Sequence, residues 1–208
     1  MVTIVEHPLI KRDVSILRNK DTATPEFRAA MKRIAAMLAA EAARYILLRE
    51  ISVLTPLEAT KGYECSHDIV LLPVLRAGAG LVEQFTDVIP DAKIGYIGLR
   101  RNEATLDNEE YYFNVPRLKP ESLVMILDPM LATGGSICSA IDRVRKAGVS
   151  QVLVVSVIAA PEGIKRVEAS FPDVPIIAAA LDRCLNDVGY ILPGLGDAGD
   201  RYHGTIES

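Results

Sequence analysis

The chain has 208 residues, a length that suits one domain with at most a small subdomain, and half of its residues are hydrophobic. It carries 23 basic and 27 acidic side chains, and the net charge of -4 disfavours a dedicated nucleic-acid binder. No run of about 18 apolar residues predicts a membrane-spanning helix, and the N-terminus lacks the basic and apolar regions of a signal peptide. Cys65, Cys138 and Cys184 lack metal-ligand spacing, so we expect thiols in a reducing cytoplasm.

We expect the N-terminal part of the chain to be structural. His7 precedes Pro8 in a segment that should be extended, and we favour a structural role for it over a catalytic one. Thr24 and Pro25 predict the start of a helix that continues to about residue 48, because apolar residues follow at steps of three and four. Residues 51–55 then predict a short strand, and residues 61–64 a turn and hairpin.

A strand, a small-residue loop and a helix are predicted over residues 69–88. The apolar run 69–75 indicates a buried strand, and residues 76–80 form a loop of small residues led by Arg76. Such a loop has an unobstructed backbone that can wrap a pyrophosphate, with Arg76 adding positive charge. A plain turn with a surface arginine is the alternative.

The next strand, residues 93–99, leads into the polar segment 100–107. Charged loops of this kind are usually solvated surface. Residues 111–115 predict a strand that returns from this segment.

The most informative stretch runs from Val124 to Ser136. The apolar residues 124–127 predict a central parallel strand, and Asp128 would stand at its carboxyl end, where open α/β sheets bind ligands. Gly134 and Gly135 allow backbone N–H groups to approach an anion, and Ser136 opens a helix whose N-terminus attracts phosphate. A carboxylate before such a loop can accept hydrogen bonds from ribose hydroxyls, so the pattern favours a sugar phosphate. The stretch lacks the ending of a P-loop, which disfavours a nucleoside triphosphatase, but an ordinary strand-to-helix connection remains an alternative.

Strand and helix alternate through residues 152–158, 161–167 and 175–181, which predicts an α/β fold with a doubly wound, mainly parallel sheet. The segment 187–201 is rich in glycine and is predicted to be an irregular loop. Its main-chain groups could match a small flat base, although a flexible tail is the bland alternative.

The segment from Asp128 through Pro129 to Ser136 resembles the phosphoribosyl pyrophosphate (PRPP) motif of type I phosphoribosyltransferases. It is most similar to the uracil phosphoribosyltransferase branch, which also places proline after the acid, and the resemblance spans nearly the whole chain. It implies a single domain, 1–208, with a core at about 69–181. A small hood would come from about 1–24 and 182–208, and an arm would project after Arg100. Ala79 and Arg183 depart from the branch, which usually has Leu and Glu there.

The resemblance also implies the site residues. The implied catalytic residues are Asp128, Arg76 and Arg101. The implied PRPP contacts are Arg76, Arg101, Asp128, Pro129, Met130, Leu131, Ala132, Thr133, Gly134, Gly135, Ser136 and Asp197. The implied uracil contacts are Tyr190, Ile191, Gly196, Asp197 and Ala198.

The activity that the resemblance implies is transfer of the 5-phosphoribosyl group from PRPP to N1 of uracil, giving UMP and pyrophosphate in pyrimidine salvage. Mg²⁺ would be held mainly by PRPP, GTP could act as an allosteric activator, and the chain would form a homodimer or a higher homo-oligomer. Neither nucleic acid nor membrane is an expected partner. Two alternatives stay open, namely a regulator with this fold that binds nucleotide or RNA, and a transferase for another nucleobase.

Overall fold

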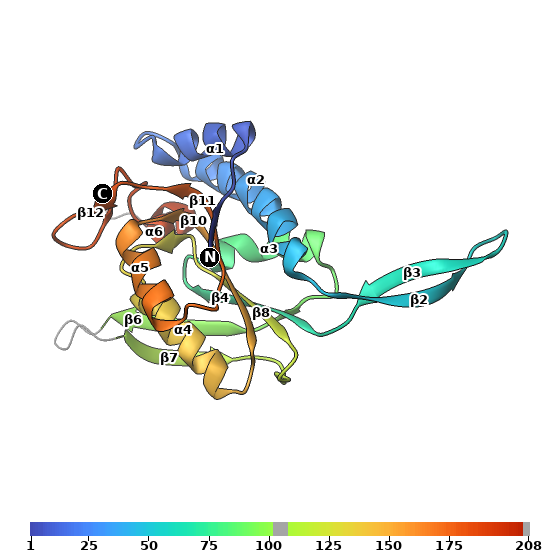
Figure 1. Ribbon diagram of the computed structural model, residues 1–208. Coiled ribbons are helices and arrows are strands. Elements are labelled where there is room, and N and C mark those ends of the chain that lie inside the picture. Colours follow the sequence, from blue (N-terminus) through green and yellow to red (C-terminus); the bar gives the residue numbers. More distant parts are fainter. Residues whose placement is uncertain (102–107, 206–208) are drawn as a thin grey trace.

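The computed structural model describes residues 1–101 and 108–205 of the chain (Figure 1). A central sheet has the strand order β1-β11-β10-β8-β4-β6-β7, with β5 beside β4 and β9 beside β10. Its strands are β1 (Val2–Ile4), β4 (Ile69–Leu75), β5 (Lys93–Ile94), β6 (Tyr96–Arg101), β7 (Asn108–Asn114), β8 (Leu123–Leu127), β9 (Met130–Leu131), β10 (Gln151–Ala159) and β11 (Ile176–Leu181).

Every pairing in this sheet is parallel except that of β6 with β7, so the prediction of a mainly parallel sheet is confirmed. Two further pairs are antiparallel and lie outside it. These are the hairpin of β2 (Leu48–Leu54) and β3 (Ala59–Cys65) and the short ribbon of β12 (Cys184–Leu185) and β13 (Ile191–Leu192). The helices are α1 (Pro8–Arg18), α2 (Thr24–Ala42), α3 (Ala79–Val88), α4 (Gly135–Lys146), α5 (Pro161–Ser170) and α6 (Ala198–His203), with a 3₁₀ turn at Ala43–Tyr45.

The sheet is buried on both faces, which explains why its central strands read as continuous apolar runs. Side chains alternate between the faces, so Leu71 and Met125 belong to the core under α1, α2 and α3. Leu72 and Ile126 belong to the second core, which α4 and α5 cover. Figure 1 shows the two helical layers on opposite sides of the sheet.

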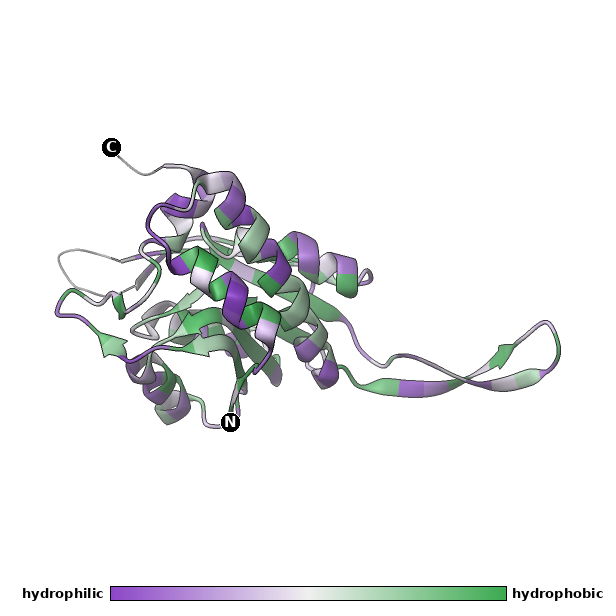
Figure 2. Ribbon diagram, turned by 90° about the horizontal axis from the view of Figure 1, so that it is seen from above, coloured by the Kyte–Doolittle hydropathy of each residue, from purple (hydrophilic) through white to green (hydrophobic). Residues whose placement is uncertain are grey.

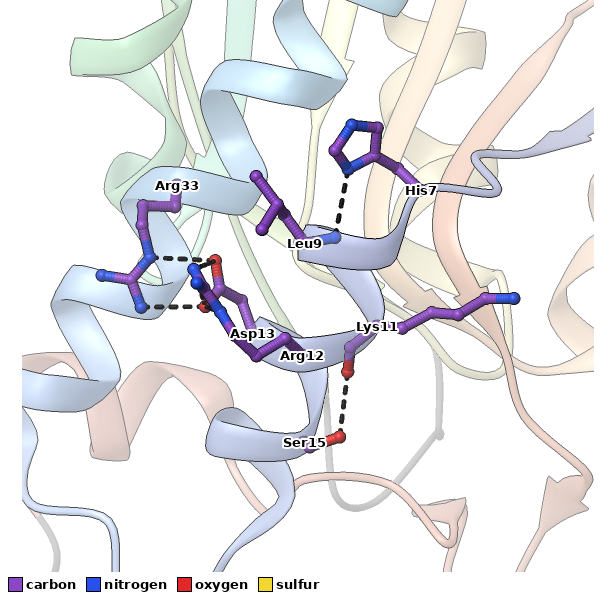
Figure 3. A network of polar contacts seen from close by, with 7 residues as sticks. All are labelled: His7, Leu9, Lys11, Arg12, Asp13, Ser15 and Arg33. Carbon is purple, nitrogen blue, oxygen red and sulfur yellow. Dashed lines mark hydrogen bonds and ion pairs between the residues drawn. The ribbon is translucent and has the colours of Figure 1, made fainter.

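The N-terminal segment is more ordered than the sequence indicates. Residues 2–4 pair with β11 as an edge strand of the sheet. The ring of His7 then caps α1, since Nδ1 accepts a hydrogen bond from Leu9 N at 3.2 Å. Asp13 of α1 is fully buried, and Arg33 of α2 donates to both of its oxygens at 2.9 Å (Figure 3). The structural role expected for His7 is therefore its observed role.

Two predicted boundaries were wrong. The helix expected to reach about residue 48 ends at Ala42, because a 3₁₀ turn follows and β2 begins at Leu48. The hairpin turn lies before residues 61–64, which belong to β3. Thr55 makes that turn, since its Oγ1 accepts from Leu57 N at 3.2 Å and from Glu58 N at 3.0 Å. The resulting hairpin extends away from the body of the molecule (Figure 2).

Within residues 1–101 and 108–205, no helix is long and apolar enough to cross a membrane.

Candidate functional site

Two glycine loops meet at the carboxyl ends of the neighbouring strands β4 and β8. The loop after β4 contains Gly78, and a Cβ built there would lie 2.3 Å from the carbonyl oxygen of Leu127. Only glycine lets the two backbones approach so closely. The close contact brings the loop that begins at Arg76 beside Asp128, where ligands bind in sheets of this class.

Asp128 is partly exposed at the end of β8, and its Oδ1 accepts a hydrogen bond from Met130 N at 3.3 Å. Burial of the carboxyl raises its pKa to about 7, and the bond from Met130 opposes that rise. The group is therefore only partly ionised at neutral pH when the site holds no ligand. Hydroxyl donors or a cation near the carboxylate would favour its charged form.

The loop after Asp128 forms a cradle at the N-terminus of α4. Gly134 has a left-handed backbone, with φ of 76°, and a Cβ there would lie 2.9 Å from the carbonyl oxygen of Gly163. A Cβ on Gly163 would in turn lie 2.3 Å from the carbonyl oxygen of Ala132. The cradle encloses about 70 Å³ and is lined by Asp128 and residues 130–137. Backbone N–H groups and the helix dipole make such a cradle suited to an anion.

Pro129 is the one residue of the predicted PRPP motif that does not line this cavity. Its ring is buried, and its carbonyl oxygen accepts from Val157 N and Ile158 N of β10, both at 3.0 Å. Pro129 thus secures the strand end to the sheet. The sequence did not single out Gly163, although a glycine in the first turn of a predicted helix was a signal for a close backbone approach.

A second hollow of about 350 Å³ unites segments that are far apart in the chain. Arg76 and Asp197, both predicted as site residues, lie in its wall. The complete lining consists of Leu75, Arg76, Ala77, Leu99, Arg100, Tyr111, Asp197 and Gly199. Arg100 donates to both oxygens of Glu109 at 3.0 Å. Sequence reasoning missed Arg100 and Tyr111, because one lay in an apparently solvated segment and the other in a strand.

The C-terminal segment was predicted to be irregular, and this was wrong in part. The strand β13 lies within it and pairs with β12, which precedes it, and α6 starts at Ala198. Asp197 caps α6, because its Oδ1 accepts from Asp200 N at 2.9 Å. An acid three residues before another acid was a readable sign of a helix start. Ala198 is buried beside this cap, and Gly196 has φ of 79°.

The remaining predicted base contacts lie elsewhere in this segment. Ile191 is buried in the core that faces α1, α2 and α3. Tyr190 is 50% exposed. Neither residue lines the cradle or the hollow.

Two arginines that the sequence did not indicate fasten the C-terminal segment to the first helices. Arg18 forms a two-pronged ion pair with the buried carboxylate of Asp182, in which Nη1 lies 2.8 Å from Oδ2. The same oxygen accepts from Gly194 N at 2.9 Å. Arg201 is also buried and donates to the carbonyl oxygens of Leu195 and Leu17, the former at 2.7 Å. The loop before α6 is therefore held rigidly.

Arg101 ends β6, but its side chain lies outside the described residues, as do residues 102–107 of the predicted arm.

Comparisons with known proteins agree on one family. A sequence profile described as uracil phosphoribosyltransferase matches residues 4–205. The chain is 48% identical over 206 residues to the uracil phosphoribosyltransferase of Fervidobacterium nodosum, with 99% of this chain and 100% of that protein covered. It is 45% identical over 207 residues to the one of Salinibacter ruber, with 100% and 99% covered.

Solved structures share the fold of this chain. The AQ2163 protein from Aquifex aeolicus superposes with a TM-score of 0.93 at 42% identity over 100% of both chains. An adenine phosphoribosyl transferase from Trypanosoma brucei superposes with a TM-score of 0.58 at 15% identity, over 89% of this chain and 88% of that one. At this low identity the second match supports the fold alone.

Proposed function

This chain belongs to the uracil phosphoribosyltransferase family, and from that premise we propose how its residues serve the reaction. The chain transfers the 5-phosphoribosyl group from PRPP to uracil, giving UMP and pyrophosphate for pyrimidine salvage. One observation supports our assignment of residues most strongly. The cradle behind Asp128 and the hollow beside Arg76 lie at the ends of adjacent strands, as a substrate with two separate phosphate groups requires.

The cradle binds the 5-phosphate of PRPP in our proposal. The N–H groups at the start of α4 face the anion, and the hydroxyl of Thr133 donates a further hydrogen bond. Asp128 accepts hydrogen bonds from the ribose hydroxyls, which also favour its ionised form. Met130, Leu131, Ala132, Gly134, Gly135 and Ser136 complete the cradle.

The loop that starts at Arg76 binds the pyrophosphate group. The guanidinium of Arg76 stabilises the negative charge that develops on the pyrophosphate oxygen as its bond to ribose C1 breaks. Arg101 is a further proposed contact of this group. Mg²⁺ binds oxygen ligands and retains several waters, and it would further offset the charge of the leaving group. In this proposal PRPP itself supplies most of the ligands of Mg²⁺.

Uracil binds on the C-terminal side of the hollow in this proposal. Gly196, Asp197 and Ala198 offer main-chain groups at the turn into α6, while Ile191 and Tyr190 support the segment that precedes them. The base must present N1 to ribose C1, and the rigid anchoring of this segment would supply that orientation. Asp197 is the nearest candidate for a general base, although its observed bond to Asp200 N also gives it a structural role.

The test is product formation from uracil, PRPP and Mg²⁺, with UMP and pyrophosphate followed together. Cytosine, adenine, hypoxanthine and orotate are run in parallel. We expect stoichiometric UMP with uracil alone, and strongly reduced turnover in Asp128→Asn with the fold retained. No product with any base, while PRPP still binds and GTP has been supplied, would instead indicate a regulator that kept the fold.

Three further properties are proposed from the family resemblance. GTP acts as an activator, the chain assembles into a homodimer or a higher homo-oligomer, and the enzyme works in the cytoplasm. Activity with and without GTP tests the first property, and sedimentation tests the second. Localisation of a tagged chain tests the third.

A further inference from the structure

The C-terminal helix α6 holds the side chain of Arg76 at the wall of the hollow. Arg76 Nη2 donates to Asp200 Oδ1 at 2.8 Å. The two side chains are 57% and 37% exposed, so the pair lies at the surface of the site. Exposed ion pairs add little to the stability of the fold. We therefore look for the effect of this pair on the orientation of Arg76.

Asp200 is itself held in place by two further hydrogen bonds. Its backbone N donates to Oδ1 of Asp197 at 2.9 Å, and its Oδ1 accepts from the hydroxyl of Thr205 at 2.7 Å. Gly204, with φ of 74°, turns the chain so that Thr205 returns to Asp200. The bonds from Thr205 and Arg76 hold the pKa of Asp200 below its usual value, so it stays ionised at neutral pH.

The helix that carries Asp200 sits directly on the loop of Arg76. A Cβ built on Gly199 would lie 3.7 Å from the Cβ of Ala77, an ordinary contact distance. A Cβ built on Gly80 would lie 2.9 Å from the ring of Tyr202, which is too close for a side chain. The position of Asp200 relative to the loop is thus determined by packing as well as by hydrogen bonds.

We infer that Asp200 is a positioning residue, which orients the guanidinium of Arg76 toward the hollow before PRPP binds. The inference rests on the proposed function of Arg76 as a pyrophosphate ligand. A guanidinium has five N–H donors, and the bond to Asp200 requires one of them, so an anion can still be met by others. Ordering the long side chain in advance lowers the entropy lost when the substrate binds.

The same contacts connect the two substrates. Asp197 caps α6 within the segment assigned to uracil, and Asp200 reaches Arg76 from the first turn of the same helix. One short helix, α6, therefore holds both the segment assigned to uracil and the loop assigned to pyrophosphate.

The experiment measures KM for PRPP, KM for uracil and kcat in Asp200→Ala, Asp200→Asn and Thr205→Val. Asp187→Ala is the matched control, because it removes an exposed acid of the same C-terminal segment outside the hollow. For Asp200→Ala we expect KM for PRPP to rise about tenfold, with much smaller changes in kcat and in KM for uracil. Asp200→Asn keeps an oxygen that accepts from Arg76, so its KM should stay within about threefold of the wild type.

Several results would overturn the inference. An unchanged KM for PRPP in Asp200→Ala would do so, as would an Asn variant that is as impaired as the Ala variant. If Asp200→Ala does not fold, Thr205→Val decides the matter, and a wild-type KM for PRPP there would count against positioning. A wild type that forms no UMP would mean that the proposed function has failed. Calorimetry with inorganic pyrophosphate then tests Asp200 directly, and equal affinities for wild type and Asp200→Ala would refute its role.

Discussion

Replacing Asp128 by asparagine should stabilise the protein while it removes activity. The carboxyl has an ordinary pKa of 3.8 and a pKa of about 7 in the fold. A raised pKa means that the folded state binds the proton more tightly than the unfolded chain does. This contribution to stability is full below the ordinary pKa, and it falls as the pH rises toward the folded value. Asparagine carries no charge at any pH, so the variant avoids the loss.

The size of the effect follows from the two pKa values. A gap of about three pH units corresponds to about 4 kcal/mol against the folded state when Asp128 is fully ionised. The free energy of unfolding of the Asn variant should exceed that of the wild type by an amount that grows by about 2 to 3 kcal/mol between about pH 5 and about pH 9. Because the carboxylate is partly exposed, solvent screening reduces this figure, and an increase of at least about 1 kcal/mol is the expectation.

The assay is urea unfolding of wild type and Asp128→Asn at about pH 5, 7 and 9, at one protein concentration, with the slopes compared to confirm the same unfolded surface. Asp91→Asn, which removes an exposed acid, shows the effect of losing one surface charge. A difference between wild type and Asp128→Asn that stays constant across this pH range would refute the reasoning, as would an Asn variant that is less stable at high pH.

Three other substitutions test the surroundings of the site. Gly134→Ala should cost about 2 kcal/mol and weaken PRPP binding, because it adds a clash to a left-handed backbone. The comparison is Gly148→Ala, with φ of 90° and open space, which should cost about 1 kcal/mol; equal melting shifts would contradict the clash. Arg18→Met leaves the buried carboxylate of Asp182 without its partner, so we expect about 3 kcal/mol of destabilisation and a raised KM for uracil, and an unchanged melting temperature would argue against this anchor. Thr133→Val should raise KM for PRPP several-fold, and an unchanged value would remove its hydroxyl from the phosphate site.

The centre of the fold could be read from the sequence because local signals there agree. The run before Asp128 is apolar throughout, as a strand buried on both faces requires, and glycines mark the loop that follows. Hydrophobic periodicity then marks α4. The strand, acid, loop and helix are therefore where they were predicted, with α4 beginning at Gly135, one residue early.

The parts that the sequence did not reveal depend on contacts between distant residues. Arg76 meets Asp200, and Arg18 meets Asp182, only after the chain has folded. Nothing in the local pattern of either arginine indicates its partner. Tyr111 lies in the hollow because β7 pairs with β6. The sequence near residues 102–107 carries no turn signal that defines the register of this pairing. The short α6 was missed because glycines on both sides favoured a loop.

The position of the sheet between two cores has a consequence for hydrogen exchange. Amide protons of β8 exchange only when both cores open, so they should report the global free energy of unfolding. A helix as short as α6 depends on its tertiary contacts, among them the bonds from Arg201 to the carbonyl oxygens of Leu17 and Leu195. The hollow thus has one wall that lies between the two cores and one that is held by a few side-chain bonds. Bound PRPP should slow exchange in both walls, because a ligand of the folded state raises the global free energy of unfolding that β8 reports.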